Sequence, residues 1–343
     1  MAALDEAGNP ASVHGAGRAA RRLLEAAREQ VAGCFGASPA GVVFTSGGTE
    51  ANALAIHGLG AGRRPIVGAT EHDAVRAAAR GAAIVPVDRH GVADLDALAS
   101  LLAEGPALVC LMLANNETGV LHPVVAAAAL CRAHGALLHV DAVQAAGRMA
   151  IEMAALGADS MAISGHKLGG PQGAGALLLG GDLALAPLIT GGGQERGRRG
   201  GTPALPAIAG MAAAAGAAVA ALRDQDRLAG LRDQIEAAAI GAGAVVMGAG
   251  AGRLGNTTCL ALPGVRADTQ VIALDLAGFQ VSAGAACSSG RVAASHVLAA
   301  MAMGELAGSA VRVSLPWNVT AEDAQRFASA YVGMAGRLVR RAA

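Results

Sequence analysis

Lysine is nearly absent from this sequence. The 343-residue chain holds 26 basic residues of the lysine and arginine types, and only one of them, Lys167, is a lysine. An ammonium group can lose its proton in a suitable pocket and attack a carbonyl, whereas a guanidinium stays charged. The presence of a single lysine side chain therefore predicts that Lys167 forms a Schiff base. The alternative is a drift toward arginine that left one lysine by chance, as a solvated surface group.

An excess of charge of either sign is also lacking. The 26 basic residues are balanced by 26 acidic ones, so the formal net charge is zero. Without a basic excess the chain has neither the footprint of a nucleic-acid-binding protein nor a polybasic membrane anchor. We therefore expect small molecules or proteins as partners, and no nucleic acid and no membrane. The charge-free stretch 203–222 is mostly alanine with two early prolines, which favours a buried or interdomain helix over a membrane span.

Paired cysteines are missing as well. The five cysteines form no Cys-x-x-Cys motif; they are Cys34, Cys110, Cys131, Cys259 and Cys287. This spacing argues against a structural zinc site and against a disulfide framework, so no metal is expected. The first residues show no basic region followed by an apolar run, and we expect a cytoplasmic protein in a reducing environment.

Strand-like and helix-like patterns alternate along most of the chain. The strand candidates are residues 42–45, 66–69, 83–87, 108–113, 137–140 and 161–164. The alternation predicts an α/β fold, with a mainly parallel sheet covered by helices on both faces. The length favours two domains. We expect a large cofactor-binding domain over residues 9–222 and a smaller α+β C-terminal domain over residues 223–343.

Polar residues follow several predicted strands, where ligands bind in such folds. A pyridoxal phosphate site needs a phosphate cradle, an acid against the pyridine nitrogen and a donor to the ring oxygen. The turn 46–50, with Thr49, offers the cradle, and Asp141 and Gln144 offer the acid and the donor. His72 follows another strand and has an imidazole that can stack on the ring or carry protons. Each has a plainer interpretation: a glycine turn, a turn or helix cap at Asp141, and a surface histidine at a helix start.

These residues lie in motifs that resemble a known family. The matching stretches are residues 8–14, 44–52, 70–72, 115–119, 139–144, 164–175, 191–202, 282–289 and 311–314. In this order, and over nearly the whole chain, they resemble the cysteine desulfurases of the class V aminotransferase group, of the housekeeping or nitrogenase-associated type. The resemblance implies the type I fold of pyridoxal-phosphate-dependent transferases. It also implies conversion of L-cysteine to L-alanine, with the sulfur supplied to iron–sulfur cluster assembly.

The resemblance also assigns roles at the cofactor. Lys167 is implied to form the Schiff base, Asp141 to bind the pyridine nitrogen and His72 to stack on the ring. The other cofactor contacts that it implies are Gly48, Thr49, Ser164 and His166 at the phosphate, and Gln144 and Asn116 at the ring oxygen. The glycine-rich segment that ends at Thr202 is implied to reach the phosphate of the other subunit of a homodimer.

On the substrate side the resemblance implies that Arg312 clamps the carboxylate, with Asn116 and Asn256 nearby. A bidentate guanidinium suits this task. Cys287 lies among small residues at 282–290, and by itself such a cysteine is usually an inert filler. In this motif it resembles the nucleophile that takes the sulfur as a persulfide and passes it to a scaffold protein.

The chain departs from the family pattern at two places. Only eight residues precede Asn9, so the usual lead-in of the family is not in the sequence; either the gene start is placed too late, or this form lacks part of its small domain. Residues 315–317 read Leu-Pro-Trp where many relatives have Leu-Gly-Arg. Two other functions stay open: a selenocysteine lyase or another class V aminotransferase, and a truncated non-catalytic scaffold.

Overall fold

The computed structural model describes residues 8–284 and 294–342, and the chain divides into two compact units. The first unit comprises Met1–Val85, Leu95–Leu113 and Pro123–Leu222, and the second comprises Pro86–Asp94, Ala114–His122 and Arg223–Ala343. Two short segments that interrupt the first unit along the chain therefore belong with the C-terminal part.

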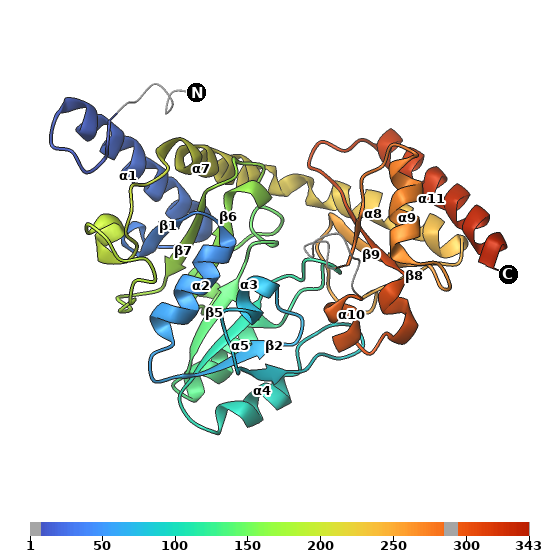
Figure 1. The fold of residues 1–343 in the computed structure, drawn as a ribbon, viewed down its shortest axis with the longest axis horizontal. Coiled ribbons are helices and arrows are strands. Elements are labelled where there is room, and N and C mark those ends of the chain that lie inside the picture. Colours follow the sequence, from blue (N-terminus) through green and yellow to red (C-terminus); the bar gives the residue numbers. More distant parts are fainter. Residues whose placement is uncertain (1–7, 285–293, 343) are drawn as a thin grey trace. The chain divides into compact units, whose positions relative to one another are not determined.

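The first unit is built on a seven-stranded sheet in the order β1-β7-β6-β5-β4-β2-β3 (Figure 1). Its strands are β1 (Val42–Thr45), β2 (Arg64–Gly68), β3 (Ala83–Val85), β4 (Ala107–Met112), β5 (Leu137–Asp141), β6 (Ser160–Ser164) and β7 (Gly175–Leu179). Only β7 runs antiparallel to its neighbours β1 and β6, and the remaining pairs are parallel. Every residue of β4 and β6 is buried, as expected for a sheet covered on both faces.

Helices cover this sheet. They are α1 (Gly15–Phe35), α2 (Gly48–Leu59), α3 (Asp73–Arg76), α4 (Leu95–Leu102), α5 (Val124–Ala133), α6 (Met153–Leu156) and α7 (Leu205–Ala220), with 3-10 turns η2 (Pro39–Gly41), η3 (Gly165–Lys167) and η4 (Gln194–Gly197). In α1 the residues Ala20, Leu24, Ala27 and Val31 form one buried face. The helix ends at Gly36, which adopts the left-handed conformation with φ 62° that glycine tolerates best.

Helix α7 is apolar nearly all round. By length and composition alone, the segment Leu205–Gly241 could cross a membrane, a test that core helices also pass. One face of α7, from Leu205 to Ala215, is buried. The packing is tight, since a Cβ on Gly165 would lie 2.9 Å from Met211 of α7, and one on Gly210 would lie 2.5 Å from Pro171. Helix α7 therefore packs directly against the turn that follows β6.

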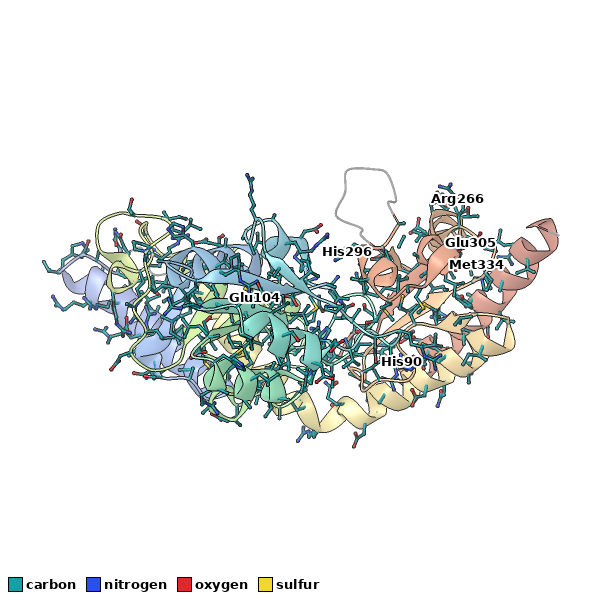
Figure 2. The ribbon with its side chains drawn as sticks, turned by 90° about the horizontal axis from the view of Figure 1, so that it is seen from below. His90, Glu104, Arg266, His296, Glu305 and Met334 are labelled. Atoms are coloured by element: carbon teal, nitrogen blue, oxygen red, sulfur yellow. The ribbon has the colours of Figure 1, made fainter. Side chains whose placement is uncertain are left out.

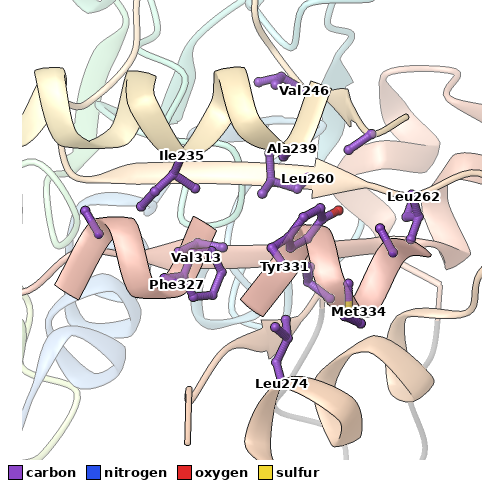
Figure 3. Close-up of a cluster of buried hydrophobic side chains, with 14 of the residues drawn as sticks. Ile235, Ala239, Val246, Leu260, Leu262, Leu274, Val313, Phe327, Tyr331 and Met334 are labelled. Atoms are coloured by element: carbon purple, nitrogen blue, oxygen red, sulfur yellow. The ribbon is translucent and has the colours of Figure 1, made fainter. Parts of the chain in front are cut away.

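The second unit has a four-stranded antiparallel sheet in the order β10-β11-β9-β8. The 3-10 turn η5 (Ala221–Asp224) contains the boundary between the units, at Leu222 and Arg223. The elements that follow it are α8 (Gln225–Gly241), β8 (Val245–Val246), β9 (Thr257–Ala261), α9 (Ala267–Asp275), β10 (Ser282–Ala283), α10 (His296–Ala300), η6 (Gly304–Gly308), β11 (Ala310–Ser314) and α11 (Ala321–Ala342). The core of the second unit gathers Leu260, Leu274, Phe327 and Tyr331, as Figure 3 shows. Charged side chains such as that of Arg266 lie on its outside (Figure 2).

Candidate active site

Four parallel strands of the first unit end at one edge of the sheet. Strand β1 ends at Thr45, β2 at Gly68, β5 at Asp141 and β6 at Ser164. Because parallel strands present their carboxyl ends at the same edge, the residues that follow them gather there. The site residues predicted from the sequence in this part of the unit, from Gly48 to Lys167, lie at these four strand ends or shortly after them in the chain.

Asp141 is a buried carboxylate held by N–H donors. Its Oδ2 accepts a hydrogen bond of 2.7 Å from Asn52 Nδ2, and its Oδ1 accepts one of 3.0 Å from the backbone N–H of Val143. Burial raises the pKa of Asp141, while the two donors and the electrostatic effect of His72 oppose that rise. N–H donors favour the ionised carboxylate, so the arrangement suits an anion that faces a cationic ring nitrogen.

A polar chain continues behind Asp141. Asn52 Oδ1 lies 2.8 Å from His139 Nε2, and His139 Nδ1 lies 2.8 Å from Ser160 Oγ. Since an amide oxygen only accepts, Nε2 carries the proton and Nδ1 accepts from the Ser160 hydroxyl. Burial lowers the pKa of His139 to about 3, so the ring is neutral. The chain fixes the orientation of the Asn52 amide, and thereby the donor that Asp141 receives.

Glu71 lies in the same buried region. Its Oε1 accepts a hydrogen bond of 2.7 Å from the backbone N–H of Met112. Burial, together with the nearby charge of Asp141, raises its pKa well above the usual value. Burial thus raises the pKa of both carboxyls, and it does so more strongly for Glu71 than for Asp141.

The N-terminus of α2 forms a cradle for an anion. The helix begins after Gly47 without any side-chain cap, so the amides of its first turn have no partner within the helix. A Cβ on Gly48 would lie 2.7 Å from Val143 Cγ2 and 3.4 Å from Ser164 Cβ. The close approach of this turn to Val143 therefore favours glycine at position 48. The exposed Thr49 follows in the same turn.

Lys167 and His166 lie in η3, immediately after β6. His166 Nδ1 lies 2.9 Å from Ser164 Oγ, which joins it to the strand end near the glycine turn. Partial burial lowers the pKa of His166, and the charge of Lys167 lowers it further. Lys167 itself is half-buried. The sequence-predicted phosphate contacts thus meet around Ser164, next to the lysine.

His72 and Gln144 lie on two other loops of this edge. His72 caps α3, since its Nδ1 accepts a hydrogen bond of 3.1 Å from the N–H of Ala74. His72 therefore lies at a helix start, but its ring is half-buried and acts electrostatically on Asp141, and its predicted role at the cofactor stays a prediction. Gln144 is half-buried, and its backbone carbonyl accepts a hydrogen bond of 2.6 Å from Arg148.

Two ion pairs anchor the glycine-rich segment that leads to Thr202. Arg199 binds Glu50 with bonds of 2.8 and 3.2 Å, and Glu195 accepts bonds of 2.8 and 2.9 Å from the buried Arg28. Glu195 adopts a left-handed conformation with φ 48°, which is unfavourable for a side chain of this kind. The anchored segment leaves Thr202 exposed on the first unit.

The second unit holds a separate group of predicted residues. Arg312 in β11 donates a 3.0 Å bond to the carbonyl of Asn116 and a 3.1 Å bond to Ser282 Oγ. The buried Oδ1 of Asn116 has no hydrogen-bond partner in the described part of the chain. Asn256 bonds to Leu315 and Thr257 at the beginning of β9, and among the described residues its side chain forms no hydrogen bond with Arg312. Its predicted substrate role stays a prediction.

Cys287 lies outside the described residues, and its predicted role stays a prediction. The other four cysteines are free thiols. Burial raises the pKa of each, mildly for Cys34, well above the usual range for Cys110 and Cys259, and to about 12 for Cys131. Because the thiolate is the nucleophile, these four are poorly suited to attack. In residues 8–284 and 294–342 no group of three or more His, Cys, Asp or Glu side chains could hold a metal ion.

A lysine, a buried acid and an uncapped helix N-terminus thus lie at the carboxyl edge of the mainly parallel sheet of an α/β protein. In such folds ligands bind at this edge. The model of the family described as Aminotransferase class-V matches residues 3–327. The chain belongs to this family.

Similar proteins agree. A cysteine desulfurase of Cereibacter sphaeroides is 42% identical over 93% of this chain and 86% of the relative. The cysteine desulfurase IscS of Dictyoglomus turgidum is 36% identical over 92% of this chain and 84% of the relative. A crystal structure of a NifS-like protein from Rickettsia africae has a TM-score of 0.91 and 32% identity, covering 97% of this chain and 93% of that one. The family and the type I fold predicted from the sequence are thereby confirmed.

Proposed function

We propose that the protein is a pyridoxal-phosphate-dependent cysteine desulfurase. It converts L-cysteine to L-alanine and moves the sulfur onto an enzyme cysteine, supplying sulfur for iron–sulfur cluster assembly. One observation carries the proposal: the single lysine of the chain lies at the same sheet edge as a buried carboxylate, Asp141, whose two acceptor atoms bind N–H donors. The similarity to proteins named cysteine desulfurase supports the same chemistry.

The residues at this edge fit the cofactor. The first-turn amides of α2 at Gly48 and Thr49, with Ser164 and His166, would bind the phosphate, and Gln144 would meet the ring oxygen. Asp141 would bind the pyridine nitrogen, and its two N–H donors favour the ionised form of the carboxyl. When bound, pyridoxal phosphate supplies an electron sink for bonds at the substrate α-carbon.

Lys167 and His72 are the residues that would transfer protons at the reacting centre. His72 uses its Nδ1 as the acceptor of the α3 cap, so the neutral ring carries its proton on Nε2. This atom is therefore the one that can give a proton to the substrate or take one from it. Lys167 would bind the cofactor and can carry a proton on its amine when it is released.

In the second unit, Arg312 and Asn116 would recognise the amino acid. The guanidinium of Arg312 has a planar fork that suits a carboxylate. Its two present contacts, to a backbone carbonyl and a hydroxyl, hold the fork in place while leaving it only half-buried. The buried Asn116 Oδ1 offers an acceptor next to that contact.

Sulfur transfer would use Cys287. The Cys287 thiolate attacks the sulfur of the substrate, an S–S bond forms, and the carbon–sulfur bond breaks. The carbon then takes a proton and leaves as L-alanine, so one L-cysteine and one enzyme thiol give one L-alanine and one enzyme persulfide. The raised thiol pKa values of the four described cysteines leave Cys287 as the one suited to this step.

The test measures L-alanine and sulfide from L-cysteine with a thiol reductant, for the wild type, Lys167→Ala and Cys287→Ala. We expect both products from the wild type alone. Cys287→Ala should keep the visible absorbance of bound cofactor and lose desulfuration, which separates a desulfurase from an aminotransferase. A wild-type protein that binds pyridoxal phosphate but releases no L-alanine would contradict the proposal.

We further propose a cytoplasmic homodimer in which Thr202 serves the site of the partner subunit, and which passes its sulfur to a scaffold protein. The exposed position of Thr202 at the end of an anchored segment supports this arrangement. Mixing Lys167→Ala with Thr202→Val tests it. If the two residues belong to different subunits of one site, mixed dimers regain desulfurase activity at one of their two sites. No regain after demonstrated subunit exchange would contradict it.

A further inference from the structure

Arg148 joins the two loops that carry Gln144 and Lys167. Its Nη1 donates a hydrogen bond of 2.6 Å to the carbonyl of Gln144, and its Nη2 donates one of 3.0 Å to the carbonyl of Lys167. The first loop follows β5 and the second follows β6, two adjacent parallel strands. A single guanidinium therefore spans the gap between neighbouring strand ends.

A second contact presses the same loops together. Gly147 adopts a left-handed conformation with φ 73°, and a Cβ there would lie 2.8 Å from Leu168 Cδ2 and 2.7 Å from Ala218 Cβ. Leu168 is the residue after the lysine, and Ala218 belongs to α7. The turn that holds Arg148 thus packs directly on the turn of Lys167, which keeps the guanidinium bridge short.

We propose that Arg148 is a positioning residue, which sets the main chain of Lys167 relative to the loop of Asp141 and Gln144. The inference rests on the proposed function, because it concerns how the lysine meets the cofactor. Both hydrogen bonds of Arg148 end on backbone carbonyls, so they constrain the main chain at Gln144 and Lys167 and do not involve the side chains of these two residues.

The chemistry of arginine suits this bridge. Two N–H groups on different nitrogens of one rigid plane reach two carbonyls at once, whereas a lysine ammonium offers its donors from one atom. Hydrogen bonds from a charged donor are stronger than neutral ones. Arg148→Met should remove both bonds while keeping the aliphatic stem, and Arg148→Lys should restore part of the effect.

Arg63 provides the matched control. It is also a half-buried arginine of the first unit, and its Nη1 contacts the carbonyls of Leu59 and Ala61 at 3.0 and 3.4 Å. Those carbonyls lie at the C-terminal end of α2, whereas the proposed phosphate contacts lie at its N-terminal end. Arg63→Met therefore removes a comparable arginine–backbone clamp away from the lysine.

The first readout is the rate at which pyridoxal phosphate leaves the purified holoprotein during dialysis, followed by visible absorbance. We expect Arg148→Met to lose the cofactor about tenfold faster than the wild type. Arg148→Lys should lie between them, and Arg63→Met should match the wild type. Equal rates for Arg148→Met and Arg63→Met would overturn the inference. A wild type that takes up no pyridoxal phosphate would instead overturn the proposed function.

The second readout needs no cofactor. Because Lys167 is the only lysine, lysine labelled with ¹³C at Cε alone gives one side-chain NMR signal in the cofactor-free protein. We expect one narrow signal for the wild type and for Arg63→Met, and a broadened or divided signal for Arg148→Met. An unchanged signal in Arg148→Met would overturn the inference.

Discussion

Asn52 donates a hydrogen bond of 2.7 Å to Asp141, while its own amide oxygen lies 2.8 Å from the proton-bearing nitrogen of His139. The amide can therefore present only its N–H group to the carboxylate. A short polar chain that begins at Ser160 thus decides which kind of atom the buried acid meets. This relationship links the interior of the sheet to the proposed cofactor site.

Asn52→Leu should weaken cofactor binding. It removes one of the two N–H donors that oppose the burial of Asp141, so the pKa of Asp141 rises further. Asp141 should then become protonated at a higher pH than in the wild type. As the pH is lowered, cofactor binding should therefore be lost at a higher pH in the variant. We expect about tenfold weaker binding of pyridoxal phosphate near pH 7, measured by absorbance titration.

Ser160→Ala serves as the control for this chain. It removes the far end of the chain and leaves the donor to Asp141 intact, so its effect on binding should be clearly smaller. Equal losses in Asn52→Leu and Ser160→Ala would show a general effect on packing and would contradict the role of the chain.

His139→Gln should make the protein less sensitive to acid. In the folded state the pKa of His139 is about 3, below the ordinary value of 6.5, so between these values the unfolded chain binds the extra proton. Stability therefore rises with pH in this window and is lost as the pH falls from about 6.5 to about 3, by about 1.4 kcal/mol per pH unit for one group. Urea unfolding between pH 4 and 6 should show a slope lower by about this amount in His139→Gln. An unchanged slope would mean that His139 does not titrate as the structure implies.

Gly48→Ala should weaken phosphate binding more than it affects folding. A Cβ at this position would lie 2.7 Å from Val143 Cγ2, so the first turn of α2 or the Val143 side chain must shift. Gly58→Ala, in the same helix, would collide with Leu185 at 2.5 Å, far along the helix from the phosphate contacts. Both variants should be less stable. Only Gly48→Ala should raise the dissociation constant for pyridoxal phosphate, and the same rise in both would count against the cradle.

Glu195→Gln should destabilise the first unit. It leaves the guanidinium of Arg28, whose side chain is 4% exposed, without its buried partner. Breaking such a pair costs about 3 kcal/mol, seen as a lower urea midpoint. Asp268→Asn breaks the surface pair with Arg266 and should leave the midpoint unchanged. If Glu195→Gln behaves like Asp268→Asn, the glycine-rich segment is not anchored by this pair.

Much of the first unit could be predicted because its strands are short apolar runs. The strand predicted over residues 42–45 is β1 itself, and the strands predicted around residues 108 and 137 lie within one or two residues of β4 and β5. The strand β7 was not predicted. It begins within a glycine-rich stretch, and its place between β1 and β6 depends on pairings that only the folded chain defines.

The candidate site was predictable where a residue type carries the chemistry, as with Lys167 and Asp141. The site was not predictable where a side chain binds backbone atoms, as Arg148 does. Every residue has a backbone carbonyl, so the sequence does not indicate which carbonyls a side chain will contact. The roles of Asn52 and His139 likewise depend on burial and on the direction of a hydrogen bond. Both residues lie in motifs that carried the family resemblance, and the motifs alone did not indicate what they contact.

The central claim is that Lys167 holds pyridoxal phosphate, and borohydride reduction tests it most directly. The protein is incubated with the cofactor, reduced, digested and analysed by mass spectrometry. Because the chain has one lysine, the account predicts a single phosphopyridoxyl group, on the peptide that contains Lys167. A modification found only at the N-terminal amine, or none at all, would contradict it.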